Sequence, residues 1–131
     1  MNAVKSLTRL ACCMLWVTIS TVYSPRIFGD SLQALGIKAQ IMLRQSLESL
    51  MIMDTAGARK VLVADDEVDL DYKKFIGTLK KELAADPSLI ETVFAWLLAA
   101  KSVERVADLA TNIAEDTIYT VEGEIVRHGQ N

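Results

Sequence analysis

The sequence predicts an all-α protein, an antiparallel three-helix bundle with an extra apolar segment at its N-terminal side. Apolar residues recur at intervals of three and four in three long stretches, a spacing typical of helices that bury one face. Residues that cap or interrupt helices separate these stretches. We therefore expect helices near 30–53, 55–84 and 87–121, within a domain that covers residues 30–123 of the 131.

Residues 1–29 form an apolar segment that supports two interpretations. Two basic residues precede an apolar run at 10–23, which is the outline of a signal peptide, but the run is too short to span a bilayer as a helix. The interpretation we favour is a remnant or divergent replacement of a preceding helix, packed on the bundle. At the other end, residues 124–131 are polar and are expected to form a tail.

The first helix is expected to begin at Asp30, which can act as an N-cap, with Gln33 three residues later as in a capping box. It should end near Met53, because Asp54 and Gly57 favour a short connection that reverses the chain. Its apolar face is predicted to consist of Leu32, Leu35, Ala39, Met42, Leu43, Ser46, Leu47 and Leu50.

The second and third helices are separated by Asp86 and Pro87. Asp86 is placed to cap the third helix and Pro87 to occupy its first turn, where a missing N–H costs nothing. Gly123 is expected to end the third helix. The apolar arc of the second helix is Ala58, Val61, Val68, Tyr72, Phe75, Ile76, Leu79 and Leu83, and that of the third includes Val103, Val106, Ala110, Ile113, Ala114 and Val121.

Acidic residues lie beside these apolar faces. Asp65 and Asp69 fall inside the apolar arc of the second helix, and an unpaired buried carboxylate is costly unless a cation neutralises it. Two adjacent antiparallel helices that each offer an acid-x-x-x-acid pair can bring their carboxylates together. The predicted metal site is Asp65, Asp69, Glu104 and Asp108, with Asn112 and Glu115 as possible supporting residues.

Carboxylate ligands favour Mg²⁺, Mn²⁺ or Fe, and the lack of nearby His and Cys makes zinc less suitable. The alternative is a solvated acidic face. In that case Asp69 would pair with Lys73 at i+4, and Glu104 or Asp108 would pair with Arg105 or Arg59.

The chain carries several short motifs of one kind of helical protein. They are ERVAD at 104–108, TNIAE at 111–115, Tyr119, Gly123, DDEVD at 65–69 and Asp86-Pro87. Together these motifs resemble the PhoU family, accessory regulators of bacterial phosphate transport, over some hundred residues from about residue 30. The residue after Asp108 is often His in the family and is Leu109 here, a change that affects the shell around the site but not the carboxylate spacing.

This resemblance implies a fold and a function. Family members resemble a tandem pair of three-helix repeats, each with an acidic motif that binds metal, and the chain has room and motif for the second repeat only. The resemblance implies a cytoplasmic regulator that contacts the phosphate ABC transporter ATPase and the phosphate sensor kinase. It would restrain the phosphate-starvation response, and it would meet the membrane only through these partners.

Composition excludes some functions and favours others. A net charge of −3 gives no basic footprint for nucleic acid. Hydrophobic residues make up 51% and charged residues 24% of the chain, which favours a further buried surface, so we expect a homodimer. No nucleophile–His pair or phosphate loop indicates an enzyme. The alternatives are a carboxylate-bridged metal-storage or redox bundle and an inactive truncated half of a PhoU-like protein.

Overall fold

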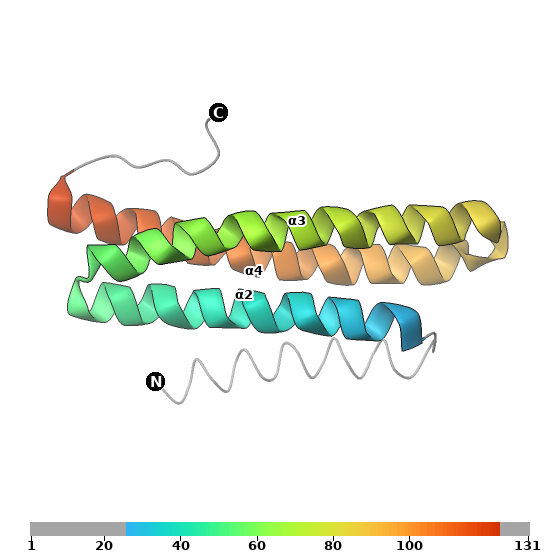
Figure 1. The fold of residues 1–131 in the computed structure, drawn as a ribbon, viewed down its shortest axis with the longest axis horizontal. Helices are drawn as coiled ribbons and strands as arrows, with labels where there is room; N and C mark the ends of the chain where they lie inside the picture. Colours follow the sequence, from blue (N-terminus) through green and yellow to red (C-terminus); the bar gives the residue numbers. More distant parts are fainter. Residues whose placement is uncertain (1–25, 124–131) are drawn as a thin grey trace.

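The computed structural model describes residues 26–123 as a bundle of three long helices. These are α2 (Arg26–Ile52), α3 (Thr55–Ala85) and α4 (Ile90–Glu122), and a short 3₁₀ turn, η1 (Pro87–Leu89), precedes α4. α2 and α4 run in one direction and α3 runs in the other (Figure 1). The predicted all-α three-helix bundle is confirmed, and residues 26–123 contain no strand.

The structure does not describe residues 1–25 and 124–131. The expectations of a signal-like or remnant segment and of a polar tail therefore concern residues outside the described part of the chain. Within residues 26–123, no helix is both long and apolar enough to cross a membrane.

Helix α2 begins earlier than the sequence predicted. Asp30 lies four residues inside the helix, which starts at Arg26, so the expected capping box at Asp30 and Gln33 is wrong. The cause is tertiary packing, because Phe28 is buried between two aromatic rings of the other helices. Its ring lies edge-on to Phe75, with 6.3 Å between centroids, and tilted against Trp96 at 5.9 Å.

The connection between α2 and α3 is short and closely packed. Met53 adopts a left-handed conformation (φ 54°), and the Asp54 N–H donates to the Ser49 carbonyl at 2.9 Å, which closes the end of α2. Asp54 occupies the N-cap of α3 without a capping hydrogen bond from its side chain. Gly57 lies so close to the end of α2 that a Cβ there would be 2.5 Å from Ser49 Oγ.

The predicted boundaries of the third helix are largely confirmed. The Asp86 carboxylate accepts a hydrogen bond from the Ser88 backbone N–H at 3.0 Å, and Pro87 occupies the first turn. That turn is 3₁₀, and the α-helix proper begins at Ile90. Gly123 ends the helix in a left-handed conformation (φ 71°), and its N–H donates to the Tyr119 carbonyl.

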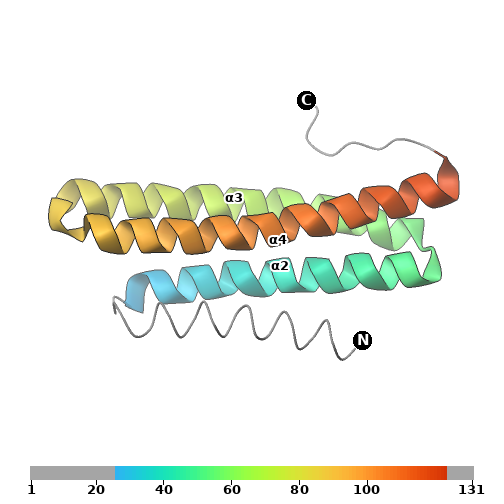
Figure 2. The same cartoon turned by 180° about the vertical axis from the view of Figure 1, so that it is seen from behind.

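Helix α4 packs along both of the other helices, as the front and back views show (Figures 1 and 2). The face of α4 that packs against them carries small side chains at helical spacing, which let the helix axes approach closely. We name these residues the alanine seam, and they are Ala99, Ala100, Ala107, Ala110 and Ala114, each at most 2% exposed.

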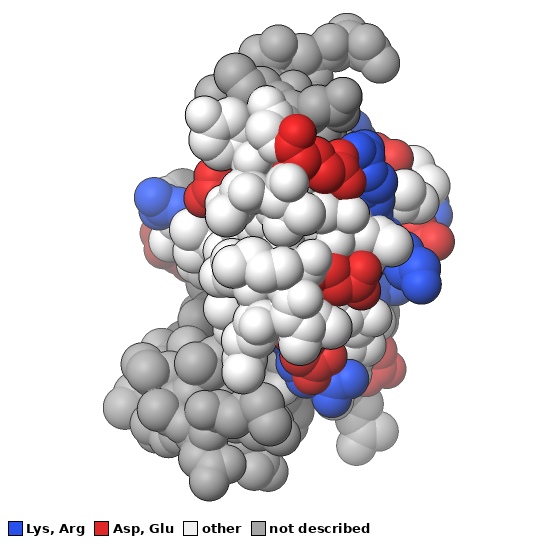
Figure 3. Space-filling view, turned by 90° about the vertical axis from the view of Figure 1, so that its left-hand side faces the viewer, with Lys and Arg blue, Asp and Glu red and all other residues white. Residues whose placement is uncertain are grey.

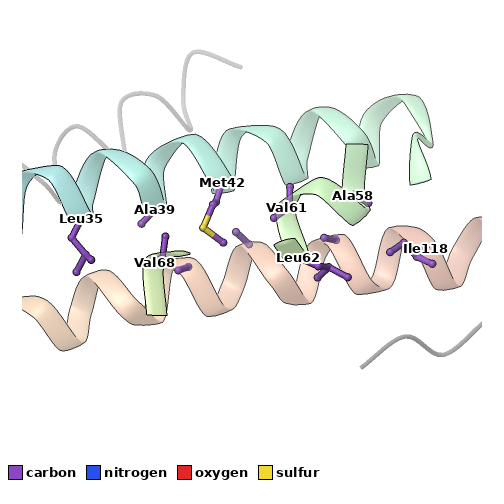
Figure 4. Close-up of a cluster of buried hydrophobic side chains, with 11 residues drawn as sticks. Leu35, Ala39, Met42, Ala58, Val61, Leu62, Val68 and Ile118 are labelled. Carbon is purple, nitrogen blue, oxygen red and sulfur yellow. The ribbon is translucent and has the colours of Figure 1, made fainter. Parts of the chain in front are cut away.

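The hydrophobic core has two parts. The part nearer the α2–α3 connection contains Met42, which points from α2 toward α4, together with Val61 and Ile118, and it extends along α2 to Leu35 (Figure 4). Near the α3–α4 connection, Phe28, Phe75 and Trp96 form an aromatic cluster with their neighbours. Trp96 is therefore a core residue.

The apolar faces end sooner than the spacing predicted. Leu50 and Val121 continue the apolar pattern of their helices, yet both are exposed, at 36% and 47%. Both lie at the end of the bundle, in or next to the last turns of their helices, where side chains have fewer neighbours to cover them. Their assignment to the core was wrong.

The close approach at Gly57 generates a stability prediction. Ala in place of Gly gains about 1 kcal/mol in an exposed helix interior. Gly77→Ala should show this gain, because nothing lies within 4 Å of its added Cβ. Gly57→Ala must push aside Ser49 and Asp54, so it should be less stable than Gly77→Ala by at least about 1 kcal/mol in urea denaturation. Equal stabilisation of the two variants would show that α2 and α3 are further apart here.

Candidate functional site

The four predicted ligands lie on two antiparallel helices, α3 and α4, and the charges of Asp69 and Glu104 act on Asp108. Asp65 and Asp69 are one turn apart on α3, and both are half-buried. Glu104 and Asp108 are one turn apart on α4, Glu104 half-buried and Asp108 exposed. The two helices run in opposite directions. Asp65 therefore lies beyond Asp69 toward the same end of the bundle as Asn112 lies beyond Asp108.

Asp108 is held in an acidic environment. The side chain as a whole is exposed, but partial desolvation of its carboxyl raises the pKa of Asp108 most, and the negative charges of Glu104 and Asp69 raise this pKa further. Lys101 and Arg105 act in the opposite direction. The charges of one α3 carboxylate and two α4 carboxylates therefore act on one another across the helix interface.

Two of these carboxylates are engaged by lysines. Lys101 Nζ donates a hydrogen bond to Glu104 one turn away, and this bond raises the pKa of Lys101. Lys73 Nζ lies 3.7 Å from Asp69 Oδ2, which is the i,i+4 pair that the solvated-face alternative predicted. Among residues 26–123, no three acidic, His or Cys side chains are grouped so that they could hold a metal ion.

The two supporting residues lie further along the same side of α4. Asn112 is exposed and Glu115 is half-buried, one and two turns beyond Asp108 toward the end of the helix. We name the six predicted residues together the acidic edge; two of them lie on α3 and four on α4. The sequence analysis did not foresee that Lys101 would bind Glu104.

Two further charged contacts were missed. Lys38 Nζ on α2 donates to Asp71 Oδ2 on α3 at 2.7 Å, and hydrogen bonds from Lys38 and Lys74 lower the pKa of Asp71. Its main partner lies on another helix, so spacing along one helix gave no signal for this contact.

Glu122 joins the end of α4 to the start of α3. Arg59 Nη2 donates to Glu122 Oε2 at 2.6 Å. Hydrogen bonding from the Thr55 hydroxyl, and then from Arg59, lowers the pKa of Glu122. The carboxylate also lies beside the N-terminal end of α3, where the helix dipole favours negative charge. This contact fixes the two helices relative to each other at the end of the bundle.

Comparison with known proteins identifies related sequences. A family model described as "PhoU domain" matches residues 32–117. A "Phosphate-specific transport system accessory protein PhoU homolog" from Burkholderia sp is 36% identical over 120 residues, which cover 92% of this chain and 51% of the relative.

Other relatives have the same description. A homologue from Pseudomonas aeruginosa is 35% identical over 80% of this chain and 43% of its own length. The accessory protein PhoU of Escherichia coli K12 is 33% identical over 75% of this chain and 41% of its own length. The chain thus spans about half the length, or less, of these relatives. No solved structure matches the chain.

The repulsion around Asp108 generates a prediction with a defined pH dependence. A carboxyl whose pKa is raised by folding costs stability once it ionises, so this cost develops as the pH rises above the unfolded-state pKa near 4. Asp108→Asn should therefore increase the free energy of unfolding at pH 7 by a few tenths of a kcal/mol, the usual size of a like-charge i,i+4 pair.

The same variant should show no gain near pH 3, where the wild-type carboxyls are largely protonated. Urea denaturation of both proteins at the two pH values is the measurement. A variant that is less stable than wild type at pH 7 would mean that the Asp108 carboxylate has a stabilising partner.

Proposed function

The chain belongs to the PhoU family, and from this premise we propose that it acts as a regulatory accessory protein of phosphate transport. The observation that carries the proposal is the match of the PhoU domain to most of the helical bundle, together with relatives that are described as accessory proteins of the phosphate-specific transport system. The role is non-catalytic and depends on protein–protein contacts.

The proposal includes a location and partners. The protein acts in the cytoplasm and contacts the ATPase of the phosphate ABC transporter and the phosphate sensor kinase, and it restrains the phosphate-starvation response when phosphate is plentiful. In this proposal two copies form a homodimer of six helices. The dimer covers apolar residues that one bundle exposes, such as Phe94 and Leu98 at 55% each. A monomer in sedimentation at tens of micromolar would contradict the dimer.

Binding to the transporter ATPase tests the functional proposal. The purified chain should bind the ATPase subunit from the same organism with a dissociation constant in the micromolar range or tighter, as expected of a regulatory contact. A cell that lacks the chain should activate its phosphate-starvation genes in phosphate-rich medium. Absence of binding to both the ATPase and the kinase, with unchanged gene expression in the deletion strain, would contradict the proposal.

We also propose that the acidic edge binds a divalent or ferric ion through Asp65, Asp69, Glu104 and Asp108. The support is the negative charge of Glu104 and Asp69 that acts on Asp108, which a cation would relieve. Binding requires Glu104 to leave Lys101 and Asp69 to leave Lys73, since the described side chains form no ready metal group. Both lysines are more than half exposed and can rotate away. The ion would supply positive charge that holds the two helix edges together.

Metal-dependent stability tests this part. Mn²⁺ or Fe should raise the melting temperature of the wild type, by linkage of binding to folding. The variant Glu104→Gln/Asp108→Asn should lose most of this rise, because it keeps the side-chain shapes while removing two ligand charges.

The matched control is Glu67→Gln/Asp71→Asn, which removes an acidic pair of the same spacing from the edge that faces Lys38. It should keep the metal response. An equal response of wild type and both variants would mean that the acidic edge is a solvated face with no metal site.

A further inference from the structure

The end of the bundle where α2 meets α3 exposes a group of consecutive large apolar residues. We name it the apolar tip, and it consists of Leu50, Met51, Ile52 and Met53. Met51 and Ile52 are each 73% exposed and Met53 is 52% exposed. Figure 3 views this end directly and shows uncharged side chains across its centre, with charged side chains around them. Water therefore contacts apolar side chains that ordinary packing would cover.

The backbone conformation at Met53, within the tip, is one that favours glycine. Met53 is the only non-glycine residue with a positive φ in residues 26–123, and it occupies the helix-end position that usually holds Gly. A side chain with a Cβ is strained there. Since half of the Met53 side chain is in contact with water, packing within the bundle does not account for a large apolar residue at this position. Such strain at an exposed position is typical of a functional contact.

The charges around the tip are unbalanced. Within 44–66 and 112–122, the segments nearest this end, seven residues are acidic and three are basic. Two of the basic residues are already paired, Arg44 with Glu48 and Arg59 with Glu122. The rest of the described chain, 26–43 and 67–111, contains nine acidic and eight basic residues. The negative charge of the bundle is thus concentrated at the end that carries the apolar tip.

We propose that the apolar tip is a docking site for a basic protein surface that holds an apolar pocket. Methionines adapt to irregular pockets and are common at binding surfaces, and the acidic surroundings would orient a pocket that is lined by Lys and Arg. A membrane is a poorer occupant, because anionic lipids repel an acidic surface. The proposal rests on the proposed function in taking the partner to be a protein, and it names the part of the chain that the partner contacts.

A peptide probe tests the tip independently of any natural partner. The probe is an amphipathic helical peptide of about 18 residues made of Leu and Lys, which presents an apolar face with a basic rim. Fluorescence anisotropy should show that Met51→Ser/Ile52→Ser weakens binding at least about tenfold relative to wild type. The same peptide with Glu in place of Lys should bind far more weakly than the Lys peptide.

The control is Phe94→Ser/Leu98→Ser, which removes two equally apolar, exposed side chains from α4 near the opposite end of the bundle. It should bind the Lys peptide as the wild type does. The variant Met53→Gly should melt at a higher temperature than wild type, because the strain is removed, and yet bind the peptide less tightly.

Several results would overturn the inference. Equal peptide affinity for wild type and the Met51/Ile52 variant would do so, and so would equal affinity for the Lys and Glu peptides. Tighter peptide binding after deletion of residues 124–131 would assign the tip to the chain's own tail. Loss of a dimer in the tip variants would assign the tip to a second copy.

The transporter ATPase separates this inference from the proposed function. If wild type and tip variants bind the ATPase equally, the tip is not the docking site and the proposed function stands. If neither the wild type nor any variant binds the ATPase or the kinase, and peptide binding still depends on the tip, the proposed function fails and the docking site stands.

Discussion

Close packing along the alanine seam of α4 is the contact on which the rest of the bundle depends. Five buried alanines allow α2 and α3 to approach the same helix along its length, so the larger residues of α2 and α3 can fill the space between them. Ala also favours the helix that it lines. Helix α4 therefore supplies the shared face against which α2 and α3 pack.

This arrangement positions the two surfaces for which we propose a function. Because α3 lies antiparallel against α4, the carboxylates of Asp69 and Asp108 are brought within electrostatic reach across the interface. The Arg59–Glu122 pair then sets the relative position of the helix ends. Beyond these ends the core stops, and the residues that connect α2 to α3 are left in water. The acidic edge is thus a consequence of the antiparallel packing of α3 against α4, and the apolar tip is a consequence of where the core ends.

Local signals in the sequence predicted the fold well, and contacts between helices explain what they missed. Asp86, Pro87 and Gly123 act through their own turns, so their roles could be read directly from the chain. The start of α2 could not, because it depends on the burial of Phe28 against rings from two other helices. The one-turn spacing of Glu104 and Asp108 could be read from the sequence, whereas the Lys38–Asp71 contact joins two helices and leaves no pattern in either.

The stability of a variant within the seam tests this account most directly. Ala110 is fully buried, and the next residue, Leu109, is 58% exposed. Urea denaturation of Ala110→Leu should show a loss of about 2 kcal/mol, because three extra carbon atoms must enter a packed interface. Leu109→Ala, next to it on the outer face, should unfold within about 0.5 kcal/mol of wild type. An Ala110→Leu protein as stable as wild type would contradict the close approach of the three helices.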